Sequence, residues 1–533
     1  MKEDNTRSLY EISNLASYEG DEPFIFVSYS HHDTEAVSKV LYEIDREKYR
    51  YWYDDTMEIG EDFRKELREK IEKCSAFLLF VSEASMNSKY CGMEIIAAYK
   101  NDKRIFPVYL QDDVEIPAPL KMVLENLQHV KGLRLEKDNF DRYIKKLVAS
   151  LPVETMRSLD IEDGVLQKCK DGSPAISIPR GVNAIGADSF KNCEKLEAID
   201  FGFEVTHLHK EAFRGCKNLK FITLPQGIRF VGESAFRDCI SMTTLTVEND
   251  DIEIGERAFE NCASLSSVRL KSGMTEIYGG VFNSCKSLES IELPEKLTIL
   301  GESSFADCIR LKKIIIPPLV IKIDDMVFNG CIELSEVSIS DSVSKIGKNA
   351  FKDCKNLKRI YLPATVSNIG AGPFRGCSSL ESITVSPKNK HFKSVDDVLF
   401  NKNKSTLLCF PAKAGISSYE IPDSVTVISD WAFCECSQLQ EVSIPDSVYE
   451  IGEGAFYLCS SLERIVIPDS VVKIDDTAFR GCSALRTVCL PDSLTDFGWG
   501  LFNGCDQVRV ICSNGSAAAS YCDAKSIPHS DHE

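Results

Sequence analysis

Residues 454–471 read GAFYLCSSLERIVIPDSV, and this pattern recurs along most of the chain. Thirteen cysteines follow a 23-residue step, in a run of nine that starts at Cys193 and a run of four that starts at Cys436. Phe stands three residues before each of them, and Leu stands three residues after each, except at Met242 and Val508. A fixed period of this length is typical of a solenoid, in which stacked units share one core.

One unit can be interpreted from its residue types. Ile465 and Ile467 alternate with their neighbours, as in a short strand with one buried face. Pro468 lacks a backbone donor and ends the strand, and Asp469 and Ser470 favour a turn. A single unit cannot bury its apolar face, whereas stacked units can. We therefore predict a β-rich solenoid over residues 160–522, followed by a C-terminal tail at 523–533.

The unit resembles the BspA-like leucine-rich repeat. The pattern of that family, a strand, then IPDSV, then IG-x-x-AF-x-x-C, stands here at Ile444–Val448 and Ile451–Cys459. The step from Cys377 to Cys436 is 59 residues, or two periods of 23 plus 13. This segment resembles the longer, irregular repeat of the family. We place the irregular repeat near 385–420 and predict a β-hairpin that protrudes from one edge.

The chain contains 21 cysteines, most of which follow the repeat. Stacked turns would bring equivalent cysteines to about 5 Å, a separation that disulfides tolerate. A zinc site, however, requires clustered Cys and His residues, and the spacing shows no such motif. We interpret the cysteines as a buried ladder of reduced, structural thiols and expect no metal.

Bulk properties exclude several classes of function. The chain has 62 Lys and Arg against 81 Asp and Glu, a net charge of −19, which disfavours nucleic acid as a partner. The start, MKEDNTR, is polar and has no apolar segment behind it, so we expect no secretory signal. No stretch approaches the roughly 18 apolar residues of a membrane span. We therefore expect a cytoplasmic protein without a membrane partner.

The first 150 residues have a different pattern. Strand-like runs alternate with segments of helical periodicity: strands at 24–29, 51–53, 76–82 and 104–110, and helices at 33–48, 63–73, 88–100 and 138–150. Such alternation predicts an α/β domain with a parallel sheet covered on both faces. The ligands of such sheets bind beyond the carboxyl ends of the strands.

Three motifs in this part resemble bacterial-type Toll/interleukin-1 receptor (TIR) domains. They are FVSYSHHD at 26–33, WYDD at 52–55 with IGEDFR at 59–64 (the BB loop of the family), and LLFVS at 78–82 with SKYCGME at 88–94. The resemblance implies a flavodoxin-like TIR domain with a parallel five-stranded sheet over 22–152, behind a polar segment at 1–21.

The same resemblance implies an activity. Many TIR domains of this type cleave NAD⁺ at the nicotinamide–ribose bond, and their catalytic glutamate corresponds to Glu94. A carboxylate can stabilise the oxocarbenium-like ribosyl centre that remains when nicotinamide leaves. We expect Glu94 in the first turn of its helix, exposed at the mouth of the cleft. A Glu at that position is also favoured by the helix dipole alone. NAD⁺ would be the substrate, with no cofactor.

Six further residues are candidates for substrate binding. Ser28, Tyr29 and Ser30 are expected to line the cleft, Asp54 and Arg64 flank the BB loop, and Tyr90 takes the place of a Trp that is frequent in the family. A tyrosine there can stack on nicotinamide or adenine. Each of these residues can equally be a surface or structural residue. We expect Cys91 to be a core residue, and His31 and His32 to be solvated.

The combined interpretation is a TIR-domain NAD⁺ nucleosidase, hydrolysing or cyclising its substrate, that is controlled by ligand sensing and self-association. An immune or anti-phage effector would have this architecture. A non-catalytic TIR scaffold is the rival hypothesis, and a repeat-based adhesin is a third. The short connection at 150–154 predicts that the solenoid controls TIR assembly sterically.

Overall fold

The computed structural model describes residues 17–18, 22–54, 61–111, 113–125, 133–134, 140–152, 159–170, 172–179 and 181–531. The chain divides into two compact units, Met1–Ile228 and Arg229–Glu533. The first unit holds an α/β domain and the first turns of the solenoid, and the second holds the remaining turns.

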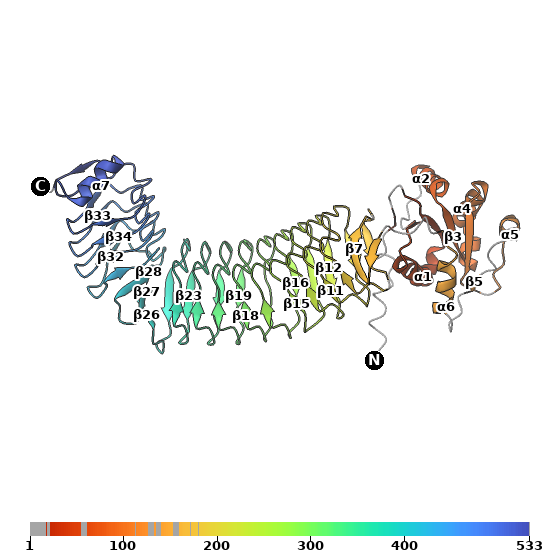
Figure 1. Cartoon of the computed structure of the whole chain (residues 1–533), viewed down its shortest axis with the longest axis horizontal. Coiled ribbons are helices and arrows are strands. Elements are labelled where there is room, and N and C mark those ends of the chain that lie inside the picture. Colours follow the sequence, from red (N-terminus) through yellow and green to blue (C-terminus); the bar gives the residue numbers. More distant parts are fainter. Residues whose placement is uncertain are drawn as a thin grey trace. The chain divides into compact units, whose positions relative to one another are not determined.

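The α/β domain is built on a sheet of five parallel strands in the order β2-β1-β3-β4-β5. Figure 1 labels β3 and β5 of this sheet and helices of the same domain. The strands are β1 (Ile25–Ser28), β2 (Tyr51–Tyr53), β3 (Ala76–Val81), β4 (Arg104–Tyr109) and β5 (Leu133–Arg134). The helices are η3 (His31–Asp33, 3-10), α1 (Thr34–Arg46), α2 (Glu61–Lys73), α3 (Glu83–Asn87), α4 (Lys89–Lys100), α5 (Ala118–Glu125) and α6 (Phe140–Val148). The predicted flavodoxin-like, parallel five-stranded sheet is confirmed.

Alternate residues of β1 enter two different cores. Ile25 and Val27 pack with apolar residues of α1 and α6. Phe26 packs on the opposite face, with apolar residues of α2 and α4. Because successive side chains of a strand point to opposite faces, Ser28 lies on the same face as Phe26, towards α4. This alternation brings Ser28 towards the second turn of α4.

The α/β domain extends upstream of its expected start at residue 22. Tyr18 is buried in the core between the sheet and α2, and its N–H donates to the carbonyl of Tyr51 at 2.9 Å. The hydroxyl of Ser17 donates to the carbonyl of Tyr53 at 3.1 Å. These two residues therefore run alongside β2 as part of the domain.

Most regular turns of the solenoid contribute strands to two sets of parallel strands, which we call the first and the second ladder, but the turn around residue 291 has no strand in the first. The first ladder contains β8 (Ala175–Ser177), β10 (Ala198–Asp200), β12 (Phe221–Leu224), β14 (Thr244–Val247), β16 (Ser267–Arg269), β19 (Lys313–Ile315), β21 (Glu336–Ser338), β23 (Arg359–Leu362), β25 (Ser382–Val385), β29 (Ser418–Glu420), β31 (Glu441–Ser443), β33 (Arg464–Val466), β35 (Thr487–Cys489) and β37 (Arg509–Ile511). The second contains β9 (Ala184–Ile185), β11 (His207–Leu208), β13 (Phe230–Val231), β15 (Glu253–Ile254), β17 (Glu276–Ile277), β18 (Ile299–Leu300), β20 (Lys322–Ile323), β22 (Lys345–Ile346), β24 (Asn368–Ile369), β30 (Val427–Ile428), β32 (Glu450–Ile451), β34 (Lys473–Ile474) and β36 (Asp496–Phe497). The predicted strand around Ile465 is β33, and the second, two-residue strand is too short to show a period of its own.

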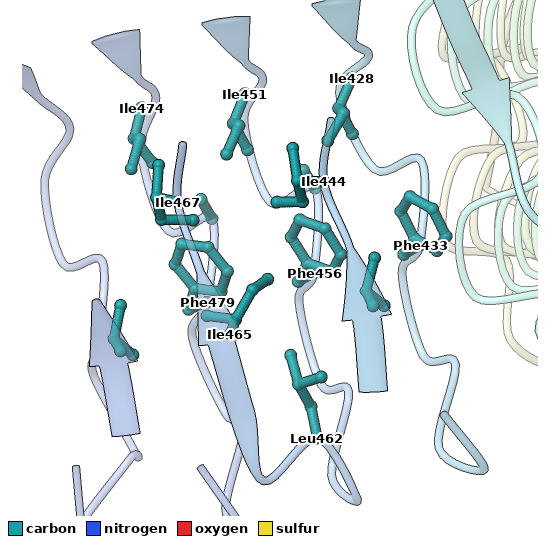
Figure 2. Close-up of a cluster of buried hydrophobic side chains, with 14 of the residues drawn as sticks. Ile428, Phe433, Ile444, Ile451, Phe456, Leu462, Ile465, Ile467, Ile474 and Phe479 are labelled. Carbon is teal, nitrogen blue, oxygen red and sulfur yellow. The ribbon is translucent and has the colours of Figure 1, made fainter. Parts of the chain in front are cut away.

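The recurrent phenylalanines stack from turn to turn in the core. Figure 2 shows Phe433, Phe456 and Phe479 as successive rungs, with isoleucines packed around them. Ring centroids along this part of the ladder are 4.9 and 5.3 Å apart, and the rings are nearly parallel. Phe328 in the other run has Phe305 at 5.9 Å and Phe351 at 5.4 Å. Within these runs the stacked rings form the core that neighbouring units were expected to share.

The cysteine ladder has a structural role. The thiol of Cys331 donates to the carbonyl of Phe305 at 3.2 Å, and the same bond between neighbouring turns recurs at Cys354 with Phe328 and at Cys459 with Phe433. Burial raises the pKa of these thiols well above its usual value, so they remain protonated donors. The expected buried thiol ladder is confirmed.

The irregular repeat contains a hairpin that is part of the solenoid wall. Its strands are β26 (Phe392–Val395), β27 (Val398–Asn401) and β28 (Thr406–Cys409), and β28 continues parallel to β30. The predicted hairpin is confirmed, but its protrusion is wrong, because Val398 and Phe400 are buried and both hairpin strands belong to the ladder sheet. Phe410 stacks on Phe433 at 5.1 Å and so supplies a rung of the ladder within the irregular segment.

Both ends of the solenoid carry additional elements. At the first end, β6 (Leu159–Glu162) pairs antiparallel with β7 (Val165–Cys169). At the last end, α7 (Ala517–Lys525) buries Cys522, and β38 (His529–Ser530) pairs with β37. Part of the expected tail at 523–533 is therefore folded onto the last turn. Within the described ranges, no helix is long and apolar enough to cross a membrane.

Candidate functional site

Glu94 lies in the second turn of α4 and is buried. The helix begins after Ser88, whose hydroxyl accepts the N–H of Cys91 at 3.3 Å, so Glu94 is its sixth residue. Only 9% of the surface of Glu94 is exposed. The expectation of an exposed first-turn residue is therefore wrong, and the helix dipole does not explain this glutamate. Burial has a physical cause here, because the carboxyl end of β1 packs against this turn.

The hydroxyl of Ser28 holds the Glu94 carboxyl. Ser28 Oγ donates to Glu94 Oε2 at 2.5 Å, and Ser28 is almost fully buried at the end of β1. Burial raises the pKa of Glu94 to about 7; the hydrogen bond from Ser28 lowers it and the charge of Asp54 raises it further. Glu94 is thus a carboxyl group that changes charge near neutral pH.

Three of the predicted residues come together around this carboxyl. Ser28 ends β1, Asp54 follows β2, and both act on Glu94 of α4. Tyr90 lies four residues before Glu94, hence on the same face of the helix, and is 41% exposed. The site therefore lies at the carboxyl ends of adjacent parallel strands, where ligands of open α/β sheets bind.

A pocket of about 310 Å³ borders the carboxyl, between α2 and α4. Tyr90, Met93 and Glu94 line it together with Arg68 and Lys100. It combines an aromatic ring, a thioether and charges of both signs. Such a lining suits a ligand that has both a flat ring and anionic groups.

Two of the predicted residues, Tyr29 and Ser30, do not present their side chains to Glu94. Tyr29 packs its ring on the α1 face of the sheet, edge-on to His31 at 5.5 Å, and its carbonyl accepts the thiol of Cys91 at 3.3 Å. Ser30 caps η3 by accepting the N–H of His32. Arg64 lies in α2, but its side chain is outside the described residues, as are 55–60 of the predicted BB loop.

The expectations for Cys91, His31 and His32 hold. Cys91 is buried, and burial, together with the nearby Glu94, raises the pKa of its thiol to about 11, so it is a packed residue and not an activated nucleophile. His31 and His32 are exposed. The described residues contain no group of three or more His, Cys, Asp or Glu arranged to hold a metal ion.

Sequence reasoning missed a second hydroxyl–carboxylate pair at this edge. Ser82 Oγ donates to Asp33 Oδ2 at 2.5 Å, and Ser82 also caps α3 through reciprocal hydrogen bonds with Ser85. The pair ties the end of β3 to η3, beside β1. Both residues stand in quoted motifs, FVSYSHHD and LLFVS, but only the fold shows that they meet.

Two family models match the chain. A model described as BspA type leucine rich repeat region matches residues 160–289, 275–406 and 408–521, and a model of the TIR domain matches residues 25–148. Among curated proteins, none matches.

Solved structures with similarity to the chain include two bacterial leucine-rich repeat proteins. A leucine rich cell surface protein from Faecalibacterium prausnitzii is 23% identical over 68% of this chain and 94% of its own, with a TM-score of 0.48. A leucine-rich repeat protein from Bacteroides ovatus is 26% identical over 69% of this chain and 87% of its own, with a TM-score of 0.43.

Proposed function

Because the chain belongs to the BspA-type leucine-rich-repeat family and carries a TIR domain, we propose that it is an NAD⁺ nucleosidase controlled by its repeats. The observation that carries the proposal is the buried carboxyl of Glu94, held by Ser28 beside a pocket. Burying an ionisable group costs free energy, because its charged form loses contact with water. Buried groups with perturbed pKa values are concentrated at functional sites.

The chemistry of glycosidic bond cleavage suits this carboxyl. The C1′–N bond of NAD⁺ breaks, its electron pair leaves with nicotinamide, and positive charge develops on the ribose. A carboxylate in a poorly solvated site stabilises that charge more strongly than one in water. Attack by water, with loss of a proton to solvent, gives ADP-ribose; attack by a nitrogen of the adenine of the same substrate gives a cyclic product.

The raised pKa of Glu94 does not oppose this role. NAD⁺ carries its positive charge on the nicotinamide ring, and a cation near Glu94 favours the ionised form of the carboxyl. Binding of the substrate would therefore lower the pKa of Glu94 and generate the carboxylate where it is used. Asp54 adds negative charge on the same side.

The pocket supplies candidate contacts for the rest of the substrate. Tyr90 can stack on the nicotinamide ring, since it precedes Glu94 by one helical turn. Arg68 and Lys100 carry positive charge for the two phosphates. Arg64 remains a candidate for the same purpose from the start of α2.

We assign the control of this activity to the leucine-rich repeats. We propose that a ligand of the solenoid, protein or other, brings TIR domains of several chains together and that assembly completes the site. We place the chain in the cytoplasm, where NAD⁺ is available and where cysteines such as those of the thiol ladder stay reduced. Depletion of NAD⁺ or production of a nucleotide signal would suit an immune or antiviral effector.

A scaffold without catalysis is the second candidate function. It is favoured by Tyr90 in place of Trp and by burial of Glu94, which leaves a substantial fraction of the free protein protonated at neutral pH. In that case Glu94 and Ser28 would serve only to join α4 to β1.

Nicotinamide release by the purified full chain, with and without forced clustering, separates these two functions. We expect release on clustering, and its loss in Glu94→Gln, which keeps the shape of the side chain. Glu83→Gln is the matched control, because Glu83 is an exposed glutamate in the first turn of α3. If clustered, folded wild type releases no nicotinamide, or if Glu94→Gln is fully active, the enzymatic assignment fails and the non-catalytic scaffold is the remaining function.

A further inference from the structure

The last turn of TIR helix α1 packs against the first turns of the solenoid. Asp45 is 3% exposed, and its Oδ2 accepts the N–H of Ser177 at 3.1 Å. Ser177 ends β8, and among the described residues β8 pairs with a strand, β10, on one side only. An unpaired strand edge invites association with other strands, and a helix that covers it prevents this. Helix α1 thus protects an edge of the solenoid.

Arg46, the last residue of α1, is enclosed by the second turn. It is 4% exposed, and the centre of its guanidinium lies 5.8 Å from the Phe203 ring. Gly202 makes this approach possible, because a Cβ built there would lie 3.0–3.1 Å from the guanidinium atoms. Gly202 also has a φ of +62°, in the left-handed region.

The contact contains buried charge. Burial and the charge of Asp200 raise the pKa of Tyr42, one turn before Arg46, to about 12. The Nε atom of Arg46 is buried without a hydrogen-bond partner among the described residues. Buried charged groups whose hydrogen bonds are only partly satisfied allow a contact to form in one geometry. They add little to the stability of that contact, because the cost of removing them from water offsets their attraction. The contact is therefore specific and readily opened.

We infer that the seam formed by Tyr42, Asp45 and Arg46 of α1 with Ser177, Asp200 and Gly202 of the first turns is a restraining contact. While it is closed, the repeats cover the end of α1 and hold the TIR domain, which limits its assembly with other copies. When it opens, α1 is exposed and assembly is favoured. The effect on NAD⁺ cleavage rests on the proposed function, whereas the restraint on assembly does not.

Two glycines provide a matched test in the full chain. Gly202→Ala would push a methyl group into the Arg46 guanidinium. Gly181→Ala would create the same kind of left-handed alanine, since Gly181 has a φ of +83°, but its Cβ meets no atom within 4 Å. Asp45→Ala is a second variant that opens the seam by removing the bond to Ser177 and does not rely on Gly202.

Hydrogen exchange of the last turns of α1 and sedimentation over a range of concentrations measure the two steps. We expect Gly202→Ala and Asp45→Ala to raise exchange about tenfold and to shift self-association to lower concentration, while Gly181→Ala follows wild type. Unchanged exchange in both seam variants would show that no closed contact exists. Raised exchange with unchanged self-association would overturn the restraint.

Nicotinamide release in the same samples separates this inference from the proposed function. If the seam variants associate more strongly but neither they nor clustered wild type cleave NAD⁺, the restraint stands and the enzymatic proposal fails. If clustered wild type cleaves NAD⁺ and the seam variants behave as wild type in both exchange and association, the enzymatic proposal stands and the restraint fails.

Discussion

At the scale of single residues, Glu94 combines burial with a polar partner in a way that packing alone does not require. Its carboxyl has one hydrogen-bond donor in Ser28, and Asp54 acts on it with like charge. Asp33 accepts a comparable bond from Ser82, but Asp33 is only partly buried, whereas Glu94 is buried. The degree of burial, more than the hydrogen bond, distinguishes Glu94 from Asp33.

The pH dependence of stability gives a prediction that needs no substrate. The folded chain holds the Glu94 proton more tightly than the unfolded chain does, since the pKa rises from 4.5 to about 7. The protonated Glu94 carboxyl contributes its full share of folding stability below the unfolded pKa of 4.5. This contribution is lost as the pH rises through the folded pKa of about 7. Because glutamine does not ionise, Glu94→Gln should not lose this stability as the pH rises.

We therefore expect Glu94→Gln to stabilise the TIR domain relative to wild type by up to about 3 kcal/mol at about pH 9, and by little at about pH 4. Thermal unfolding of both proteins across this range measures the difference. A pH-independent difference between the two proteins would contradict the environment assigned to Glu94. Glu83→Gln, which alters an exposed carboxyl, serves as the control.

At the scale of elements, the turns of the solenoid are held together by the stacked phenylalanine rings and the cysteine thiols at their centre. The ring of Phe328 stacks on the ring of the turn before it and on that of the turn after it, and the thiol of Cys331 hydrogen-bonds to the turn before its own. Removing one ring therefore breaks two contacts and leaves a cavity between three turns.

Phe328→Ala should destabilise the array by about 3–5 kcal/mol, the usual cost of truncating a buried Phe. Phe221→Ala is the matched control, because Phe221 is 47% exposed on β12 and is not one of the phenylalanines that stand three residues before a repeat cysteine. Thermal unfolding and exchange of the turns around residue 328 are the measurements. Overlapping melting curves for Phe328→Ala and wild type would mean that the rings are not core residues.

The elements also show where sequence reasoning succeeds and where it stops. The 23-residue period predicted the Phe and Cys ladders because every turn repeats the same contacts. Strands of two residues, such as β34, and the short β5 carry too few residues for a period. The hairpin at 392–401 was predicted, but its place in the sheet depends on pairing with β28, which is a tertiary contact.

The same limit applies to the candidate site. The motifs identified Ser28, Asp54 and Glu94 as candidates, and the fold brings them together. The bond between Ser28 and Glu94, and the burial of Glu94, depend on how α4 packs against β1. The opposite orientation of Tyr29 follows from strand alternation and was predictable, once Ser28 is known to face α4.

At the scale of the whole molecule, the TIR domain and the first turns share one compact unit. We propose that the expected steric control acts through the seam around Asp45 and Arg46. The C-terminal end of the array is closed separately, by α7 and β38. The first end therefore differs from the last in that a second domain covers it.

Cutting the chain after Pro152 should raise NAD⁺ turnover per TIR domain in the absence of ligand, because the restraint of the first turns is lost. Turnover against protein concentration, for the fragment and the full chain, is the measurement. A fragment that needs an added oligomeriser to match the clustered full chain would show that the repeats also supply proximity. Superimposable curves without any oligomeriser would show that the repeats do not regulate the enzyme.

The central claim is that the ionised carboxyl of Glu94 performs the cleavage of NAD⁺. Its most direct test is the pH dependence of kcat/KM for nicotinamide release by clustered wild type and by Ser28→Ala. We expect activity to rise with pH around a midpoint near 7, as the carboxyl ionises. The hydrogen bond from Ser28 lowers the pKa of Glu94, so its loss should move the midpoint to higher pH. A flat profile in wild type, or an unmoved midpoint in folded Ser28→Ala, would contradict the account.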